Sequence, residues 1–179
     1  MHVKRAQTKG FSHREPTIMA ETTHDTLIAW LQEAHAFAQH GETMLGGRAE
    51  ALSSDYPVLS NRLNEHVAET RQHRREIAQL LDDLGADTST AKDIGGKLSA
   101  LGHSWGTQLS GETPVQAVAA SIAFEHFEIA NYRALIAVAD IAEAGQVKAT
   151  LESLVADDVA MSQWLDDTLI DITRRYVGA

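Results

Sequence analysis

The chain has 179 residues, 44% of them hydrophobic and 22% charged, and its formal net charge at pH 7 is −10. This length suits one globular domain, and the negative charge argues against nucleic acid as a partner, because nonspecific binding to phosphates needs a basic surface. The absence of cysteine excludes disulfides, thiolate catalysis and cysteine-ligated metal sites, and it agrees with the cytoplasm as the expected compartment. We expect no membrane contact, since no stretch approaches the roughly 18 apolar residues of a membrane span.

The N-terminal residues differ in charge from the rest of the chain. Residues 1–18 contain four basic residues and one acidic residue, and they show no helical or strand periodicity. Gly10 and Pro16 are expected to interrupt any helix there. We therefore predict a flexible basic arm over residues 1–21 and one domain over residues 22–179. The arm lacks the apolar segment of a secretory signal. A disordered leader, or a start at Met19, explains it more simply than a tether for a partner.

Two helices are predicted in the first half of the domain. The first begins near Thr22, because hydroxyl residues that can cap a helix precede the acidic Asp25. The second runs from Pro57, which suits a first helical turn, to Gly85, which suits the position after a last turn. Both carry a stripe at helical spacing that should be buried. The stripes comprise Leu27, Leu31, Ala34, Ala38, Gly41, Leu45 and Leu52 in the first helix, and Leu59, Leu63, His66, Thr70, His73, Ile77, Leu81 and Leu84 in the second.

The second half of the domain is predicted to hold two more helices after a connector over residues 86–111. The connector contains a short helix that ends near Leu101. The third helix runs from Pro114 to near Gly145, and the fourth from Gln146 to Tyr176. A connector of this length lets the second and third helices run parallel. The fold class is therefore all-α, a four-helix bundle with a long crossover that contains a short helix.

Acidic residues fall on helix faces that should be buried. Glu125 and Glu128 lie one turn apart on the inner stripe of the third helix, beside Val118, Ile122 and Tyr132. Asp158, Glu69 and the two histidines hold comparable positions on or at the edge of the other stripes. An ionised carboxylate that leaves water needs a cation, a metal or a proton as its partner. The buried carboxylates therefore predict a polar site in the core that holds a cation, a metal or a proton.

Acids and histidines that project into a four-helix bundle are the usual ligands of two-metal carboxylate centres. Two divalent ions bring about four positive charges, which several carboxylates balance and bridge, and imidazole completes the coordination. We therefore predict an iron or manganese site. Its candidate ligands are His66, Glu69, His73, Glu125, Glu128 and Asp158.

Several short stretches, taken together, point to one family. They are residues 30–36 (WLQEAHA), 56–59 (YPVL), 65–70 (EHVAET) and 124–130 (FEHFEIA), and Met161 with the WL pair at 164–165. On these stretches the chain from about His24 to Tyr176 resembles the YciE/YciF-type, ferritin-like stress proteins. The resemblance implies a ferritin-like bundle, a homodimer, a role in a bacterial stress response and a di-metal site like that of rubrerythrin-type relatives.

The sequence departs from that family's pattern at candidate ligand positions. These are Ala38, where the family has a glutamate in the first helix; Asp157 and Asp158, which replace a glutamate pair; and Gln163, where the family has an acid. Glu42, one turn past Ala38, and His35, at the edge of the stripe, are candidate substitutes for the missing ligand.

Two functions therefore stay open. In the first, the protein is stress-associated, and iron or manganese at the site reacts with dioxygen or peroxide. The intact pair of Glu125 and Glu128 favours it. In the second, the protein is a non-catalytic helical dimer that serves as a scaffold or binds a protein partner. The buried histidines and Tyr132 then satisfy the carboxylates in a metal-free network. Ala38 favours this second hypothesis, because it removes one ligand.

Overall fold

The computed structural model describes residues 16–88 and 113–179, with side chains from residue 23 onward. No strand occurs within these ranges, so the predicted all-α fold is confirmed. The four helices are α1 (Pro16–Leu52), α2 (Pro57–Asp83), α4 (Pro114–Ile141) and α5 (Gly145–Val177). None of them has an apolar stretch of the length needed to cross a bilayer.

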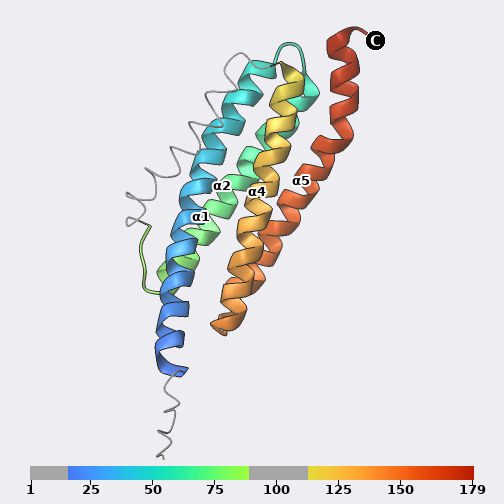
Figure 1. Cartoon of the computed structure of the whole chain (residues 1–179). Helices are drawn as coiled ribbons and strands as arrows, with labels where there is room; N and C mark the ends of the chain where they lie inside the picture. The colour runs from blue at the N-terminus through green and yellow to red at the C-terminus, as the bar shows by residue number, and fades with distance from the viewer. Residues whose placement is uncertain (1–15, 89–112) are drawn as a thin grey trace, which may run out of the picture.

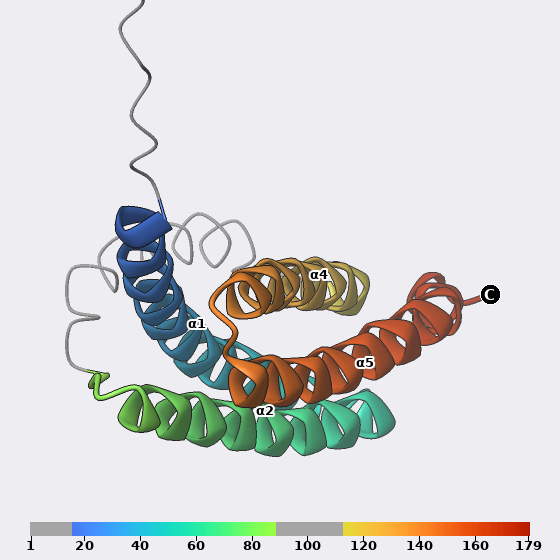
Figure 2. The same cartoon turned by 90° about the horizontal axis from the view of Figure 1, so that it is seen from below.

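The helices form two antiparallel pairs. α1 packs along α2 and α4 packs along α5, whereas α1 with α4 and α2 with α5 make smaller contacts. α2 and α4 start at the same end of the bundle and run in the same direction (Figure 1), which confirms the predicted crossover topology. The short helix predicted within the connector lies outside the described residues. Seen from below, α5 lies between α4 and α2, and its C-terminal turns extend past the start of α4 (Figure 2).

The start of the first helix was predicted wrongly. α1 begins at Pro16 instead of near Thr22, so residues 16–21 of the predicted arm are helical. Proline has no backbone N–H to donate, but the first turn of a helix leaves that group without a helical partner anyway. Pro16 therefore begins the helix instead of interrupting the chain ahead of it.

The ends of the other helices follow the sequence more closely. α2 begins at Pro57 and ends where predicted, with Gly85 at a φ of +72° after its last turn. α4 begins at Pro114, where Thr113 accepts a hydrogen bond from the Gln116 backbone N–H. It ends at Ile141, four residues before the expected Gly145, which is instead the first residue of α5.

The buried face of α4 lies partly off the predicted stripe. Phe124 and Leu135 are almost fully buried, whereas Ile122, which we placed on the stripe, and Ile136 are half-buried at its edge. Most of α4 is apolar all the way around, so hydrophobic periodicity defines its inner face poorly. Glu125 and Glu128 are buried as predicted.

The core consists of two apolar clusters at opposite ends of the bundle. The α1–α2 turn cluster includes Leu45, Leu52, Leu59, Leu63, Phe124 and Leu165. The α4–α5 turn cluster includes Leu27, Leu31, Ile77, Tyr132, Leu151 and Leu154. Buried polar side chains separate the two clusters; we call them the polar layer, and they are His66, Thr70, His73, Glu125, Glu128 and Asp158.

Helix α1 contributes no charged side chain to this layer. Ala38 is fully buried and belongs to neither apolar cluster. One turn further on, Gly41 lies so close to α4 that an added Cβ atom would be 2.6 Å from Cζ of Phe124. The Phe124 ring cannot easily move, because it stacks on Phe37 with ring centroids 4.8 Å apart. Glycine at position 41 is therefore required by the close packing of α1 on α4.

We expect Gly41→Ala to destabilise the protein by about 1–3 kcal/mol, because the added methyl group collides with the enclosed Phe124 ring. Gly46→Ala is the matched control in the same helix, since a Cβ atom at Gly46 meets no atom within 4 Å. It should stabilise the protein by about 0.5–1 kcal/mol by reducing the conformational freedom of the unfolded chain. Chemical denaturation of both variants measures the difference. Equal effects of the two substitutions would contradict the close approach of α1 and α4.

Candidate metal centre

His66 of α2 is fully buried between two carboxylates. Its Nδ1 lies 2.6 Å from Oε2 of Glu69, and its Nε2 lies 3.0 Å from Oε2 of Glu125. Burial by itself lowers the pKa of His66, but the hydrogen bonds to Glu125 and Glu69 and the charges of Glu125 and Asp158 outweigh it and raise the pKa to about 9. Without a metal, His66 is therefore an imidazolium that donates a hydrogen bond to each carboxylate.

His73, two turns along the same helix, has a similar pair of neighbours. Its Nε2 lies 3.2 Å from Oδ2 of Asp157, and its Nδ1 lies 3.6 Å from Oδ1 of Asp158. The second distance is too long for a hydrogen bond. Burial lowers the pKa of His73, and the hydrogen bond that His73 donates to Asp157 only partly offsets this. His73 is therefore neutral near pH 7, with Nε2–H donated to Asp157 and the Nδ1 lone pair directed toward Asp158.

The two histidines share one arrangement. Each directs one ring nitrogen to an outer, partly exposed carboxylate, Glu69 or Asp157, and the other to an inner, fully buried carboxylate. Metal-ligating histidines are usually held in this way, because a hydrogen bond on the outer nitrogen fixes the tautomer and the ring orientation. The α2 side of the polar layer thus presents two oriented imidazoles to the carboxylates of α4 and α5.

The inner carboxylates are poorly satisfied by the protein. Among the described residues, Glu125 Oε1, Glu128 Oε2 and both carboxylate oxygens of Asp158 are buried without a hydrogen-bond partner. Burial and then the charge of Glu125 raise the pKa of Asp158 to about 8. Burial, with the charges of Asp158 and Glu125, raises the pKa of Glu128 well above its ordinary range. Such unpaired oxygens are costly in a folded protein unless a proton or a cation binds them.

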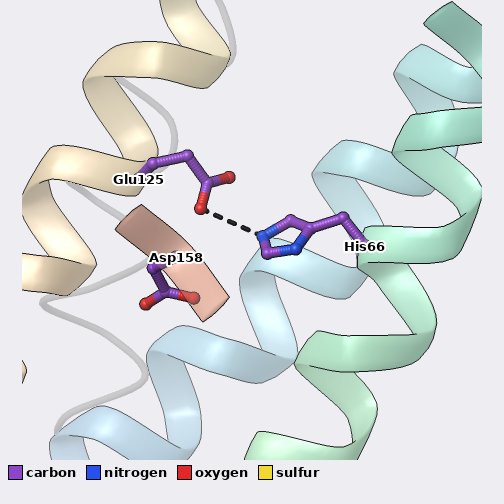
Figure 3. A group of neighbouring side chains, drawn as sticks. All are labelled: His66, Glu125 and Asp158. Carbon is purple, nitrogen blue, oxygen red and sulfur yellow. Dashed lines mark hydrogen bonds and ion pairs between the residues drawn. The ribbon is translucent and has the colours of Figure 1, made fainter. Parts of the chain in front are cut away.

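Three of these side chains offer a compact donor set. One ligand atom each from His66, Glu125 and Asp158 lies within 4.8 Å of the other two. The side chains converge from α2, α4 and α5 (Figure 3). Two ligand atoms about 2.1 Å from the same ion are about 3 to 3.4 Å apart, which agrees with the 3.0 Å between His66 Nε2 and Glu125 Oε2. Imidazole nitrogen and carboxylate oxygen suit iron, manganese and zinc, so the residues present fit a divalent metal.

The other predicted ligands surround this group. Glu128 is fully buried, and its charge interacts with those of Asp158 and Glu125. His73 lies beside Asp158. Glu69 is on the outer nitrogen of His66 and is 37% exposed at its side chain. The role of each as a ligand stays a prediction.

Neither proposed substitute for the missing α1 ligand joins the layer. Glu42 accepts hydrogen bonds from Nε of Arg71 at 3.0 Å and from Nε of Arg74 at 2.6 Å. The two arginines of α2 therefore hold the mostly buried Glu42 carboxylate away from the polar layer. His35 is half-buried, and burial together with the charge of Arg74 lowers its pKa.

Two functional contacts were missed from the sequence. Arg62 binds Glu69 through contacts of 3.3–3.4 Å, and these hold the carboxylate that orients His66. Arg62 and Glu69 are seven residues apart, which is two helical turns, and this spacing could have indicated that they lie on the same face of α2. Asp157, whose side chain is 54% exposed, also binds His73. No sequence pattern indicates which exposed acid reaches a buried histidine on another helix.

Comparison with known proteins identifies the family. The model of a family described as a domain of unknown function, DUF892, matches residues 22–178. The chain belongs to this family. It is also similar to a protein of Xanthomonas campestris pv. campestris whose crystal structure is known, with 27% sequence identity and a TM-score of 0.71. That match covers 87% of this chain and 96% of the other.

A second solved structure defines the fold class more closely. It is described as one of the ferritin-like, diiron-carboxylate proteins of Bacillus anthracis, and it matches with a TM-score of 0.66 over 82% of this chain and 97% of the other. The sequence identity is 17%, so the likeness concerns the fold alone. The DUF892 chain therefore has a ferritin-like four-helix bundle, as predicted, with buried carboxylate and histidine side chains between the helices.

The protonation of the layer predicts how stability depends on pH when no metal is bound. A group whose pKa is raised on folding binds more protons in the folded than in the unfolded chain between the two pKa values. The free energy of unfolding therefore falls as the pH rises through that interval, by about 1.4 kcal/mol per pH unit for each such proton. The interval runs from 3.8 to about 8 for Asp158 and from 6.5 to about 9 for His66. Glu128 acts in the same direction.

We therefore expect the Tm of chelator-treated protein to fall as the pH rises from 6.5 to 9. His73 and Glu69, whose pKa values are lowered, act in the opposite direction only below about pH 6.5. Asp158→Asn is the matched variant, because a neutral amide replaces the protonated acid and one titration is lost. Its Tm should fall less over the same range. A wild-type Tm that stays constant or rises would contradict the raised pKa values of both Asp158 and His66.

Proposed function

We propose that this DUF892 protein is a ferritin-like metal protein of the YciE/YciF type that binds iron or manganese in its polar layer. The observation that carries this proposal is the pair of histidines, each anchored by an outer carboxylate and directed at inner carboxylates that have unpaired oxygens. A metal ion between His66 and Glu125 would take the place of the Nε2 proton. It would also bind oxygens that have no protein partner.

The inner side chains of the polar layer would bind the metal, and the outer carboxylates would orient the histidines. His66 Nε2, Glu125 and Asp158 would hold the metal, with Glu128 and His73 next to them in the same layer. Glu69 and Asp157 would keep the histidines oriented. When bound, iron or manganese supplies the electron exchange with dioxygen or hydrogen peroxide, which we propose as the substrates. The apolar clusters on both sides limit the access of water to the layer.

Consumption of peroxide would agree with a bacterial stress-response role in the cytoplasm, and we propose a homodimer as the working form. The partly exposed Trp30 of α1 and the exposed Ile141 at the end of α4 are apolar surface that a second copy would cover. Light scattering of the purified protein tests this assembly without reference to the metal.

The alternative is a metal-free helical scaffold that binds a protein partner. Two observations favour it: Ala38 leaves α1 without a ligand, and His66 already bridges two carboxylates. Against it, a metal-free network needs Tyr132 to hydrogen-bond the acids, and its hydroxyl makes no hydrogen bond to any described residue. A metal would also bind the unpaired carboxylate oxygens of Glu125, Glu128 and Asp158, which a metal-free network leaves to protons alone.

Metal removal separates the two functions. We expect Mn²⁺ or anaerobic Fe²⁺, at about one hundred times its Kd, to raise the Tm by about 5–10 °C, and chelator to reverse the shift. Glu128→Gln should reduce this shift, because the neutral amide removes a negative charge beside the metal. Without metal the same variant should have nearly the wild-type Tm, because an amide resembles the protonated acid. Glu33→Gln, at an exposed position of α1, is the matched control and should keep the full shift. A Tm that does not respond to metal or chelator would favour the scaffold.

A graded variant tests the outer carboxylates. Glu69→Gln keeps the size of the side chain but weakens its hydrogen bond to His66. It should weaken metal binding by about 10- to 100-fold without abolishing it. Isothermal titration calorimetry with Mn²⁺ gives the Kd. Complete loss of binding would mean that Glu69 is itself a ligand, as we first predicted.

A further inference from the structure

Tyr132 combines a fully buried ring with a hydroxyl group that has no partner among the described residues. The ring belongs to the α4–α5 turn cluster. Tyrosine is usually placed in a core only where its hydroxyl can reach a hydrogen-bond partner. Phenylalanine would fill the same space without the cost of burying an unpaired hydroxyl, so the hydroxyl calls for an explanation.

The other buried hydroxyl groups of the described chain are satisfied. Ser60 donates to the backbone carbonyl of Ala49, and Thr70 and Ser121 each donate to the carbonyl one turn earlier in their own helix. Ser162 Oγ lies 3.2 Å from Nε2 of His126. Tyr132 is the exception in a protein that otherwise pairs its buried hydroxyls.

Tyr132 shares the buried face of α4 with the carboxylates of the candidate metal centre. Tyr132 follows Glu128 by one turn on the buried face of α4. Burial, followed by the charges of Glu128, Asp158 and Glu125, raises the pKa of Tyr132 well above its ordinary range. The phenol therefore keeps its proton and stays a hydrogen-bond donor. It makes no hydrogen bond to these carboxylates, although they are close enough for their charges to act on it.

The layer has few donors to offer to a bound anion. Carboxylates only accept hydrogen bonds when ionised. The outer ring nitrogens of His66 and His73 are already directed at Glu69 and Asp157, and the inner nitrogens would face the metal. Of the polar layer and Tyr132 together, only the Tyr132 hydroxyl is a hydrogen-bond donor without a partner.

We propose that the Tyr132 hydroxyl donates a hydrogen bond to a small anion, of the size of hydroxide or azide, that binds the metal in the polar layer. This inference rests on the proposed metal-binding function and adds a ligand-binding residue to it. Such a donor lowers the free energy of the bound anion without binding the metal itself. It therefore changes anion affinity and leaves metal affinity unchanged.

Azide is the probe for this role. Iron(III)-loaded wild-type protein and the Tyr132→Phe variant are titrated with sodium azide, and the azide-to-iron charge-transfer absorption gives the Kd. We expect Tyr132→Phe to raise the azide Kd about tenfold, the usual effect of one hydrogen bond to a charged group. The Kd for iron should stay within about twofold of wild type. Tyr176→Phe, at an exposed position near the C-terminus, should change neither value.

The stability of the metal-free variant supplies an independent readout. Removal of an unpaired buried hydroxyl should leave the Tm unchanged or raise it. A lower Tm would show that the hydroxyl has a structural partner and would overturn the proposal. An unchanged azide Kd in an iron-loaded variant would also overturn it, while leaving the metal site intact. If the wild type binds no iron, the proposed function fails, and this inference fails with it.

Discussion

The cost of removing carboxylates from water governs this structure. Glu125, Glu128 and Asp158 are buried in the middle of the bundle, and several of their oxygens have no protein partner among the described residues. Two charged groups beside them ease the cost only in part: the imidazolium of His66 and, further out, the guanidinium of Arg62 on Glu69. Burial and the neighbouring carboxylates raise the pKa values of Asp158 and Glu128, so protons compensate for the remainder in the metal-free chain. A divalent ion would compensate for it more completely.

The rest of the bundle keeps this polar layer in place. Apolar clusters lie on both sides of the layer and supply the hydrophobic stabilisation that offsets the burial of charge. α1 contributes small residues here, and the close contact of Gly41 with Phe124 brings α1 against α4. The polar side chains therefore come from three helices, and α1 closes the fourth side without a ligand of its own. In this respect the site differs from one in which all four helices supply carboxylates or histidines.

Much of the fold and of the polar layer could be predicted from the sequence, because buried residues recur at the period of the helix. The stripes of α1 and α2 are buried as predicted, apart from the half-buried Leu84, and so are the inward positions of His66, His73 and Asp158. The inner face of α4 was harder to define, because a helix that is apolar all around gives periodicity little contrast. Contacts between exposed and buried groups on different helices, such as Asp157 with His73, depend on distances that only the packed bundle defines. The start of α1 was missed because proline was taken as a helix breaker, although it suits a first turn.

The central claim is that one metal ion binds where His66, Glu125 and Asp158 converge. Anomalous X-ray diffraction from crystals grown with Mn²⁺ tests it most directly, because the signal locates the metal without any assumption about activity. We predict an anomalous difference peak within coordinating distance of His66 Nε2 and of a carboxylate oxygen from Glu125 and from Asp158. This prediction would be contradicted by a layer without such a peak, in which His66 still bridges Glu69 and Glu125 in the presence of excess metal.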